Sequence, residues 1–233
     1  MRVLTEKEMR ERVCEENLAL QKHGLVIFTW GNVSMVDRER ECFCIKPSGV
    51  SYAEMKPEHM VFVNFKGETL GGSYRPSSDT MTHLALYLNY PQIGGVVHTH
   101  STYATAWAQA GKDLPCFGTT HADDFRGAVR TTRPMTREEI EGEYEWNTGL
   151  VLCETIGNRD PLESPALLVF GHGPFVWGRD AEEAVHNAVV LEECAKMGIL
   201  TREINREAQG LDPVLVDKHF LRKHGNNAYY GQK

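Results

Sequence analysis

The sequence has no apolar run approaching the roughly 20 residues of a membrane-spanning helix, and its N-terminus lacks the apolar segment of a secretory signal. It contains neither the Walker nor the Rossmann glycine pattern, so nucleotide binding is not indicated. Its 25 Lys and Arg against 32 Asp and Glu leave a formal net charge of −7. That charge argues against general binding to nucleic acid or anionic membranes. We therefore expect a cytoplasmic protein with neither kind of partner.

Cysteine pairing is also missing, because none of the six cysteines forms a C-x-x-C motif. We expect them to be buried small hydrophobic residues in a reducing compartment. Cys42 and Cys44 form a C-x-C pair in a short predicted strand, which leaves binding of a soft metal open. With 233 residues, 41% of them hydrophobic, the chain is long enough for one α/β domain spanning residues 1–233.

The segment GGVVHTH at 94–100 is predicted to form a buried strand that ends in two histidines. Because side chains alternate along a strand, His98 and His100 are expected on one face and both could bind one metal ion. Ten histidines in a chain of 233 residues give roughly 0.4 such pairs by chance, so the spacing alone is weak evidence.

A third histidine strengthens the metal hypothesis. His172 follows the apolar run at 166–169 and is flanked by Gly171 and Gly173, which allow close approach of the backbone. Three imidazoles with an open coordination position are typical of a catalytic zinc site.

The chain contains short predicted strands, first arranged as hairpins and then separated by helices. Strands are expected at 25–28, 33–36, 42–45, 60–64 and 94–100; helices are expected at 5–22, 80–90, 102–110, 137–158 with a bend near Gly149, and 181–197 ended by Gly198. The segment 118–124 is expected to be a loop. This order favours a mixed or antiparallel α/β sheet.

Two predicted loops combine groups that bind phosphates or sugars. The loop at 46–49 offers a lysine, a hydroxyl and a glycine amide, and Ser77 with Ser78 precedes a predicted helix whose N-terminus favours an anion. The same residues also fit ordinary turns and helix caps, so the pattern leaves both interpretations open.

Nine segments together resemble the class II aldolase/L-ribulose-5-phosphate 4-epimerase family. They are TWGNVS at 29–34, IKPSGV at 45–50, PSSDT at 76–80, VHTHS at 97–101, GTTHAD at 118–123, GEYEW at 142–146, HGPF at 172–175, DKHFLRKHG at 217–225 and AYYGQ at 228–232. The resemblance covers nearly the whole chain. The segment around His172 departs from the family pattern. That pattern reads His-Ser-His, whereas the residue before His172 is Gly171 here.

The resemblance implies a fold with a central, largely antiparallel sheet flanked by helices, and a C4 homotetramer with active sites at subunit contacts. It implies one divalent ion per subunit, zinc by analogy, held by His98, His100 and His172 with Asp79 beside it. Further implied roles are substrate and phosphate binding by Asn32, Lys46, Ser48, Gly49, Ser77 and Ser78, acid/base catalysis by Asp123 and Tyr230, and support by Thr119, Glu145, His219 and Arg222.

The resemblance also implies a sugar-phosphate substrate, and it leaves three functions to compare. The first is epimerisation at C4 of L-ribulose 5-phosphate to D-xylulose 5-phosphate by cleavage and re-formation of the C3–C4 bond. The second is a class II aldolase, such as one acting on fuculose 1-phosphate, in which the position of Asp79 is typically Glu. The third is a non-catalytic, adducin-like module, which loss of the metal ligands would mark.

The remaining histidines and the C-terminal tyrosines have simpler interpretations. We expect His186 to be an ordinary helix residue, His83 to pack in the core and His121 to be structural. Tyr229 and Tyr230 would ordinarily be packing residues, and only the family position makes Tyr230 a catalytic candidate.

Overall fold

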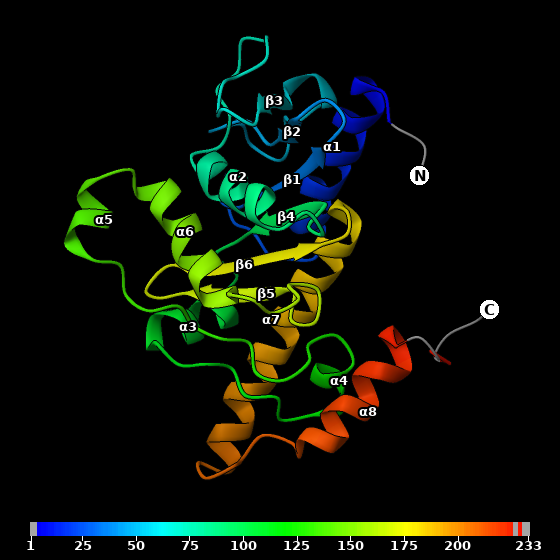
Figure 1. Cartoon of the computed structure of the whole chain (residues 1–233), viewed down its shortest axis with the longest axis vertical. Helices are drawn as coiled ribbons and strands as arrows, with labels where there is room; N and C mark the ends of the chain where they lie inside the picture. Colours follow the sequence, from blue (N-terminus) through cyan, green and yellow to red (C-terminus); the bar gives the residue numbers. More distant parts are fainter. Residues whose placement is uncertain (1–3, 226–227, 230–233) are drawn as a thin grey trace.

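The computed structural model describes residues 4–225 and 228–229, which form one six-stranded sheet between two layers of helices (Figure 1). The strands are β1 (Asn32–Asp37), β2 (Cys42–Ile45), β3 (Val61–Asn64), β4 (Gly95–His98), β5 (Ala166–Val169) and β6 (Gly173–Gly178). Their spatial order is β3-β2-β1-β4-β6-β5, and every neighbouring pair is antiparallel. The expected largely antiparallel α/β fold is confirmed.

Helices and strands do not alternate regularly along the chain. They are α1 (Glu6–Lys22), η1 (Pro57–His59), α2 (Thr80–Asn89), α3 (Thr102–Ala110), α4 (Thr119–Ala122), α5 (Arg137–Glu141), α6 (Tyr144–Ile156), α7 (Ala181–Ile204) and α8 (Pro213–His224). The helix α1 begins with a capping box, in which Thr5 and Glu8 each accept a hydrogen bond from the other's backbone N–H. Among the described residues, no helix is long and apolar enough to cross a membrane.

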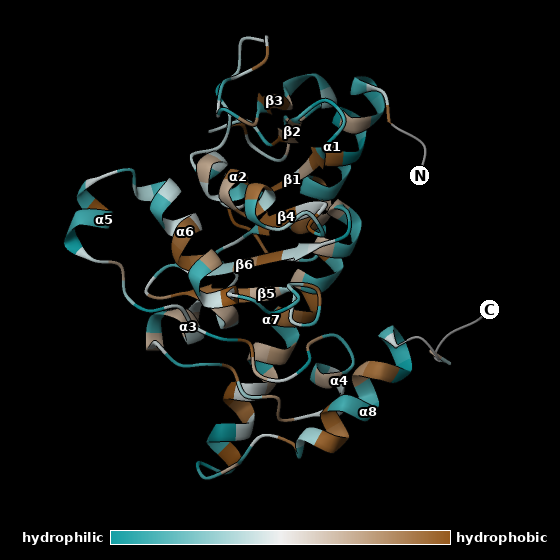
Figure 2. Ribbon diagram, in the orientation of Figure 1, coloured by the Kyte–Doolittle hydropathy of each residue, from teal (hydrophilic) through white to brown (hydrophobic). Residues whose placement is uncertain are grey.

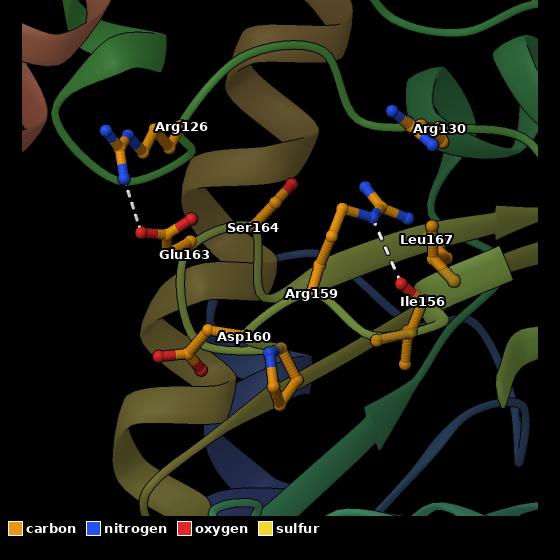
Figure 3. Close-up of a pocket in the computed structure, with 9 residues that line it drawn as sticks. Arg126, Arg130, Ile156, Arg159, Asp160, Glu163, Ser164 and Leu167 are labelled. Atoms are coloured by element: carbon orange, nitrogen blue, oxygen red, sulfur yellow. Dashed lines mark hydrogen bonds and ion pairs between the residues drawn. The ribbon is translucent and has the colours of Figure 1, made fainter.

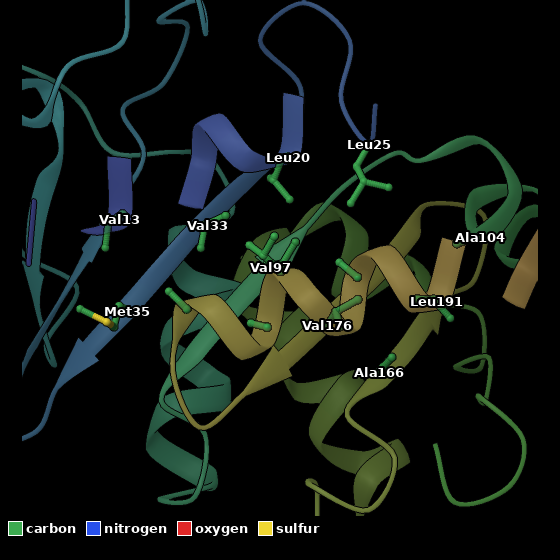
Figure 4. Close-up of a cluster of buried hydrophobic side chains, with 14 of the residues drawn as sticks. Val13, Leu20, Leu25, Val33, Met35, Val97, Ala104, Ala166, Val176 and Leu191 are labelled. Atoms are coloured by element: carbon green, nitrogen blue, oxygen red, sulfur yellow. The ribbon is translucent and has the colours of Figure 1, made fainter. Parts of the chain in front are cut away.

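Two hydrophobic clusters cover the two faces of the sheet. Val97 faces α1, α3 and α7 together with Val33 and Val176 (Figure 4). Its neighbour Val96 points the other way, into the cluster beneath α2 and α6 with Trp177. Figure 2 shows apolar segments on the strands and alternating polar and apolar segments along the helices around them. β4 is thus fixed from both sides, which determines where His98 is placed.

All six cysteines are free, and five are buried, as expected for small core residues. Burial raises the pKa of Cys42, and Cys44 is shifted in the same direction. Both thiols therefore stay protonated at neutral pH, which disfavours soft-metal binding at the C-x-C pair.

Several predicted boundaries were wrong for physical reasons. Residues 25–28 form no strand, because Phe28 has a left-handed backbone with φ of 55° and turns the chain. The helix expected at 137–158 is interrupted at Gly142, and Gly149 instead lies inside α6, where a Cβ would come within 2.5 Å of Ala85. The predicted loop at 118–124 contains the short helix α4.

Candidate metal centre

Three histidine side chains converge at one end of the central strands. His98 is the last residue of β4, His100 lies just beyond it, and His172 lies in the turn between β5 and β6. Their ligand nitrogens all lie within 4.8 Å of one another, and the ring centroids are 4.7 to 5.0 Å apart. The strand β4 ends before His100. The predicted alternation of side chains along one strand therefore does not explain how the His98 and His100 rings meet. The three imidazoles are nevertheless close enough to hold one metal ion.

Backbone packing explains why the rings can meet. β4 pairs with β6 so that His98 lies opposite Phe175, which brings the β5–β6 turn beside His98. A Cβ at Gly173 would lie 2.8 Å from the Thr99 carbonyl oxygen and 3.3 Å from the His100 ring. A side chain at residue 173 would therefore push the turn away from His100.

The chemical state of the histidines suits a divalent ion. His98 Nδ1 lies 2.9 Å from the Pro174 carbonyl oxygen, so Nδ1 carries the proton and Nε2 keeps its lone pair for a metal. Burial and the neighbouring imidazoles lower the pKa of His172 to about 4, and burial also lowers that of His100. His172 Nδ1 is buried without a hydrogen-bond partner among the described residues. Three converging imidazoles of this kind fit a zinc-like ion.

Asp79 lies in the same pocket but outside the group of mutually close nitrogens. Its Oδ2 accepts a hydrogen bond from Asn32 Nδ2 at 2.7 Å, and Asn32 also donates to Ser77 Oγ at 3.0 Å. Burial would raise the pKa of Asp79, but His98, His83 and the Asn32 hydrogen bond together lower it below its ordinary value. Asp79 is therefore a carboxylate held beside the three histidines.

The pocket around these groups, called the metal pocket below, has a volume of about 260 Å³. Two loops form its other wall: the Ser48 N–H donates to the Arg75 carbonyl at 2.9 Å, and the Ser77 N–H donates to the Lys46 carbonyl at 3.0 Å. All the expected substrate and phosphate residues line this pocket, namely Asn32, Lys46, Ser48, Gly49, Ser77 and Ser78.

Lys46 is the only lysine or arginine that lines the pocket within the described part of the chain. Its side chain is buried, its Nζ donates to the Thr29 carbonyl at 3.0 Å, and it lies 5.1 Å from the centre of the Tyr52 ring. Burial lowers its pKa to about 8, although Asp79 acts in the opposite direction. The pocket thus presents one buried cation among several hydroxyl groups.

A second cluster forms elsewhere from the expected acid/base and supporting residues. Asp123 follows α4, and its carboxylate is bound by His219 and Arg222 of α8 at 2.9 to 3.1 Å. Figure 1 shows α4 and α8 side by side at the end of the molecule away from β3. None of these three residues lines the metal pocket. The structure therefore brings the predicted site residues together as two groups.

The other residues named from the sequence lie outside both groups or outside the described part of the chain. Thr119 is exposed at the start of α4, and Glu145 of α6 accepts a hydrogen bond from Thr82 through its backbone carbonyl. Tyr230 lies outside the described residues.

His83 and His121 are buried and hydrogen-bonded, as expected for structural residues. His186 of α7 lies 3.6 Å from the Asp124 carboxylate, a contact that the sequence did not indicate.

A separate pocket lined by three arginines contains none of the predicted site residues (Figure 3). Arg126 forms ion pairs with Glu163 and with Asp217 of α8. Arg159 Nε donates to the Ile156 carbonyl at 3.0 Å, at the end of α6. These two arginines have structural partners, and Arg126 helps to hold α8 near α4.

Two residues that contact the metal pocket were not among the predicted site residues. The Trp30 ring lies 6.1 Å from that of His100, and Tyr52 donates to the loop that carries Trp30. Trp30 could have been found from its place in the segment TWGNVS. Nothing in the local pattern distinguishes Tyr52 from an ordinary core aromatic.

Comparison with known proteins places these features in context. Residues 11–199 match the family described as the Class II Aldolase and Adducin N-terminal domain. An L-fuculose 1-phosphate aldolase structure is 25% identical, with 90% of this chain and 95% of that chain covered and a TM-score of 0.76. YgbL from Klebsiella pneumoniae, a candidate aldolase/epimerase/decarboxylase, is 27% identical, with 93% and 99% covered and a TM-score of 0.75. An L-fuculose-1-phosphate aldolase from Thermus thermophilus shares the fold at 23% identity, with 87% and 99% covered and a TM-score of 0.69.

Proposed function

Because the chain belongs to the class II aldolase and adducin family, we propose that it is a metal-dependent enzyme that cleaves and re-forms the C3–C4 bond of a sugar phosphate. The proposed substrate is L-ribulose 5-phosphate and the product D-xylulose 5-phosphate, so the reaction is an isomerisation. The observation that carries the proposal is the pocket in which three converging histidines face one buried lysine and several serines.

The proposed roles follow from the donor groups. His98, His100 and His172 hold the ion, zinc by family analogy, and Asp79 adds a nearby carboxylate. A divalent ion held there would supply Lewis-acid stabilisation of the negative charge that bond cleavage leaves on the C2 and C3 oxygens. Lys46 and the serine hydroxyls bind the phosphate, and the amide of Asn32 keeps the Asp79 carboxylate oriented.

Inversion at C4 needs two proton-transfer groups. The C4 hydrogen is not adjacent to the carbonyl, so simple deprotonation at C4 is unfavourable, whereas C3–C4 cleavage leaves the charge next to C2. The C4 hydroxyl loses its proton as the C3–C4 bond breaks and the aldehyde forms. The aldehyde then turns its other face, C3 attacks it to re-form the C3–C4 bond, and a second group returns a proton to the C4 oxygen on that side. We assign these roles to Asp123 and Tyr230.

Asp123 can serve this reaction only if a second chain supplies it, since it does not line the metal pocket of its own chain. The proposed C4 homotetramer meets this requirement by placing α4 and α8 of one subunit against the pocket of the next. Exposed apolar side chains support such a contact: Val214 on α8 is 77% exposed and Ile204 at the end of α7 is 88% exposed. Burial of such residues at a subunit contact would be favourable.

The second candidate is a sugar-phosphate aldolase that releases its two fragments. The similarity to L-fuculose 1-phosphate aldolase over 90% of this chain favours it. The aspartate at position 79, where such aldolases typically have Glu, favours the epimerase. A non-catalytic, adducin-like module is disfavoured because all three metal-binding histidines are present and converge.

The two reactions are separated by product analysis. The zinc-loaded protein is incubated with L-ribulose 5-phosphate and, separately, with L-fuculose 1-phosphate. The proposal predicts D-xylulose 5-phosphate in a coupled assay. Accumulation of dihydroxyacetone and glycolaldehyde phosphate, or turnover of L-fuculose 1-phosphate alone, would identify an aldolase.

A further inference from the structure

The wall of the pocket next to Asn32 is a tight loop with an unusual backbone. Phe28 and Gly31 both have left-handed conformations, with φ of 55° and 74°. A left-handed conformation at a bulky residue such as Phe28 is costly, so the surrounding contacts must hold it. At Gly31, a Cβ would lie 2.9 Å from the His98 carbonyl oxygen, so this loop packs directly against the metal-binding strand.

Two buried side chains hold the carbonyl groups of this loop. Lys46 Nζ donates to the Thr29 carbonyl at 3.0 Å. The Tyr52 hydroxyl is shared between the carbonyls of Trp30 at 2.8 Å and Gly31 at 3.0 Å. The three successive carbonyls of residues 29–31 are therefore each held by a side-chain donor.

Tyr52 also contacts the lysine itself. Its ring is 2% exposed, and Lys46 Nζ lies 5.1 Å from the ring centre, within the range of a cation–π interaction. Burial raises the pKa of the Tyr52 hydroxyl, so the group remains a donor at neutral pH. One side chain thus contacts both the cation of the pocket and the loop that faces it.

We propose that Tyr52 is the positioning residue of the phosphate-binding part of the pocket. It fixes the Trp30–Gly31 backbone through its hydroxyl and the Lys46 ammonium through its ring, so that an anion meets a preformed site. A lysine side chain is otherwise flexible, and ordering it upon binding would weaken the affinity. This inference rests on the proposed function, because it assumes that the pocket binds a phosphate group.

The test compares Tyr52→Phe with Tyr90→Phe. Tyr90 is a matched control because its hydroxyl also donates to two backbone carbonyls, those of Cys153 at 2.9 Å and Gly157 at 3.1 Å, and it does not line the pocket. The dissociation constant of inorganic phosphate is measured by calorimetry on each zinc-loaded protein, together with zinc content, thermal unfolding, KM and kcat. A third variant, Tyr52→Met, removes the ring as well as the hydroxyl.

Tyr52→Phe is expected to weaken phosphate binding and raise KM by about 2- to 12-fold, as expected for one lost hydrogen bond. Tyr52→Met should weaken binding further, while zinc content stays unchanged and Tyr90→Phe binds phosphate normally. Equal phosphate affinity in Tyr52→Phe and Tyr90→Phe, with similar losses of thermal stability, would show that Tyr52 is only a core residue. Failure of the wild-type protein to bind phosphate would overturn the proposed function, and this inference with it.

Discussion

Arg222 binds the Asp123 carboxylate through two hydrogen bonds, Nε to Oδ1 at 3.1 Å and Nη2 to Oδ2 at 2.9 Å, although the residues are 99 positions apart. His219, one turn earlier on α8, adds a contact of 3.0 Å. Burial would raise the pKa of Asp123, but the hydrogen bonds from Arg222 and His219 outweigh it and lower the pKa. Asp123 is therefore ionised at neutral pH and fixed in one orientation, as a proton acceptor needs to be.

The first prediction concerns this carboxylate. Asp123→Asn should lower turnover of L-ribulose 5-phosphate by ~10²–10⁴, the range typical of removing a general acid or base. Zinc content and phosphate affinity should remain at wild-type levels, because Asp123 lies outside the metal pocket. Glu193→Gln is the control, since it removes an exposed carboxylate from α7. Near-normal turnover of Asp123→Asn would remove this residue from the mechanism.

The second prediction concerns the metal. His98→Asn should reduce zinc to well below one ion per chain, as measured by elemental analysis, because only two of the three histidines remain. Turnover should fall by ~10²-fold or more, since metal stabilisation of charge contributes several kcal/mol. The exposed His23 offers a matched control as His23→Asn. A metal-free His98→Asn protein with full activity would refute the assignment.

The third prediction is an alkaline limit set by Lys46. Its pKa is lowered to about 8, so the side chain is charged below that pH and loses its charge above it. The kcat/KM for the sugar phosphate should therefore fall as pH rises through about 8, because this ratio reports ionisation of the free enzyme. Lys46→Arg keeps its charge and should move the fall to higher pH. An unchanged alkaline limb in that variant would assign the limit to another group.

The gathering of these residues in one pocket could be predicted from the sequence, because they lie at or near strand ends in recognisable segments. Asn32 begins β1, Lys46 follows β2, and His98 ends β4. The antiparallel pairing places the start of β1 beside the ends of β2 and β4, so these residues lie at the same end of the sheet. The role of Tyr52 was not predictable, since it depends on a loop that lies about 20 residues earlier in the chain.

Glycine was the least reliable predictor of helix boundaries, because a glycine can either end a helix or permit close packing inside one. Gly198 was expected to end the helix that begins at Ala181, but α7 continues to Ile204. A Cβ at Gly198 would lie 2.7 Å from Leu114 and 3.1 Å from the Trp107 ring, so this glycine permits close packing. Only the tertiary neighbours distinguish a packing glycine from a capping one.

The account requires the metal pocket of one chain and the Asp123 cluster of another to act in a single reaction. Mixed tetramers test this most directly. They are reassembled from equal amounts of His98→Asn and Asp123→Asn chains, verified by native mass spectrometry, and assayed with L-ribulose 5-phosphate. In a ring with one site at each contact, about one quarter of the sites receive both intact groups. The account predicts about one quarter of wild-type activity from two nearly inactive parents; verified mixed tetramers with no activity above the parents would contradict it.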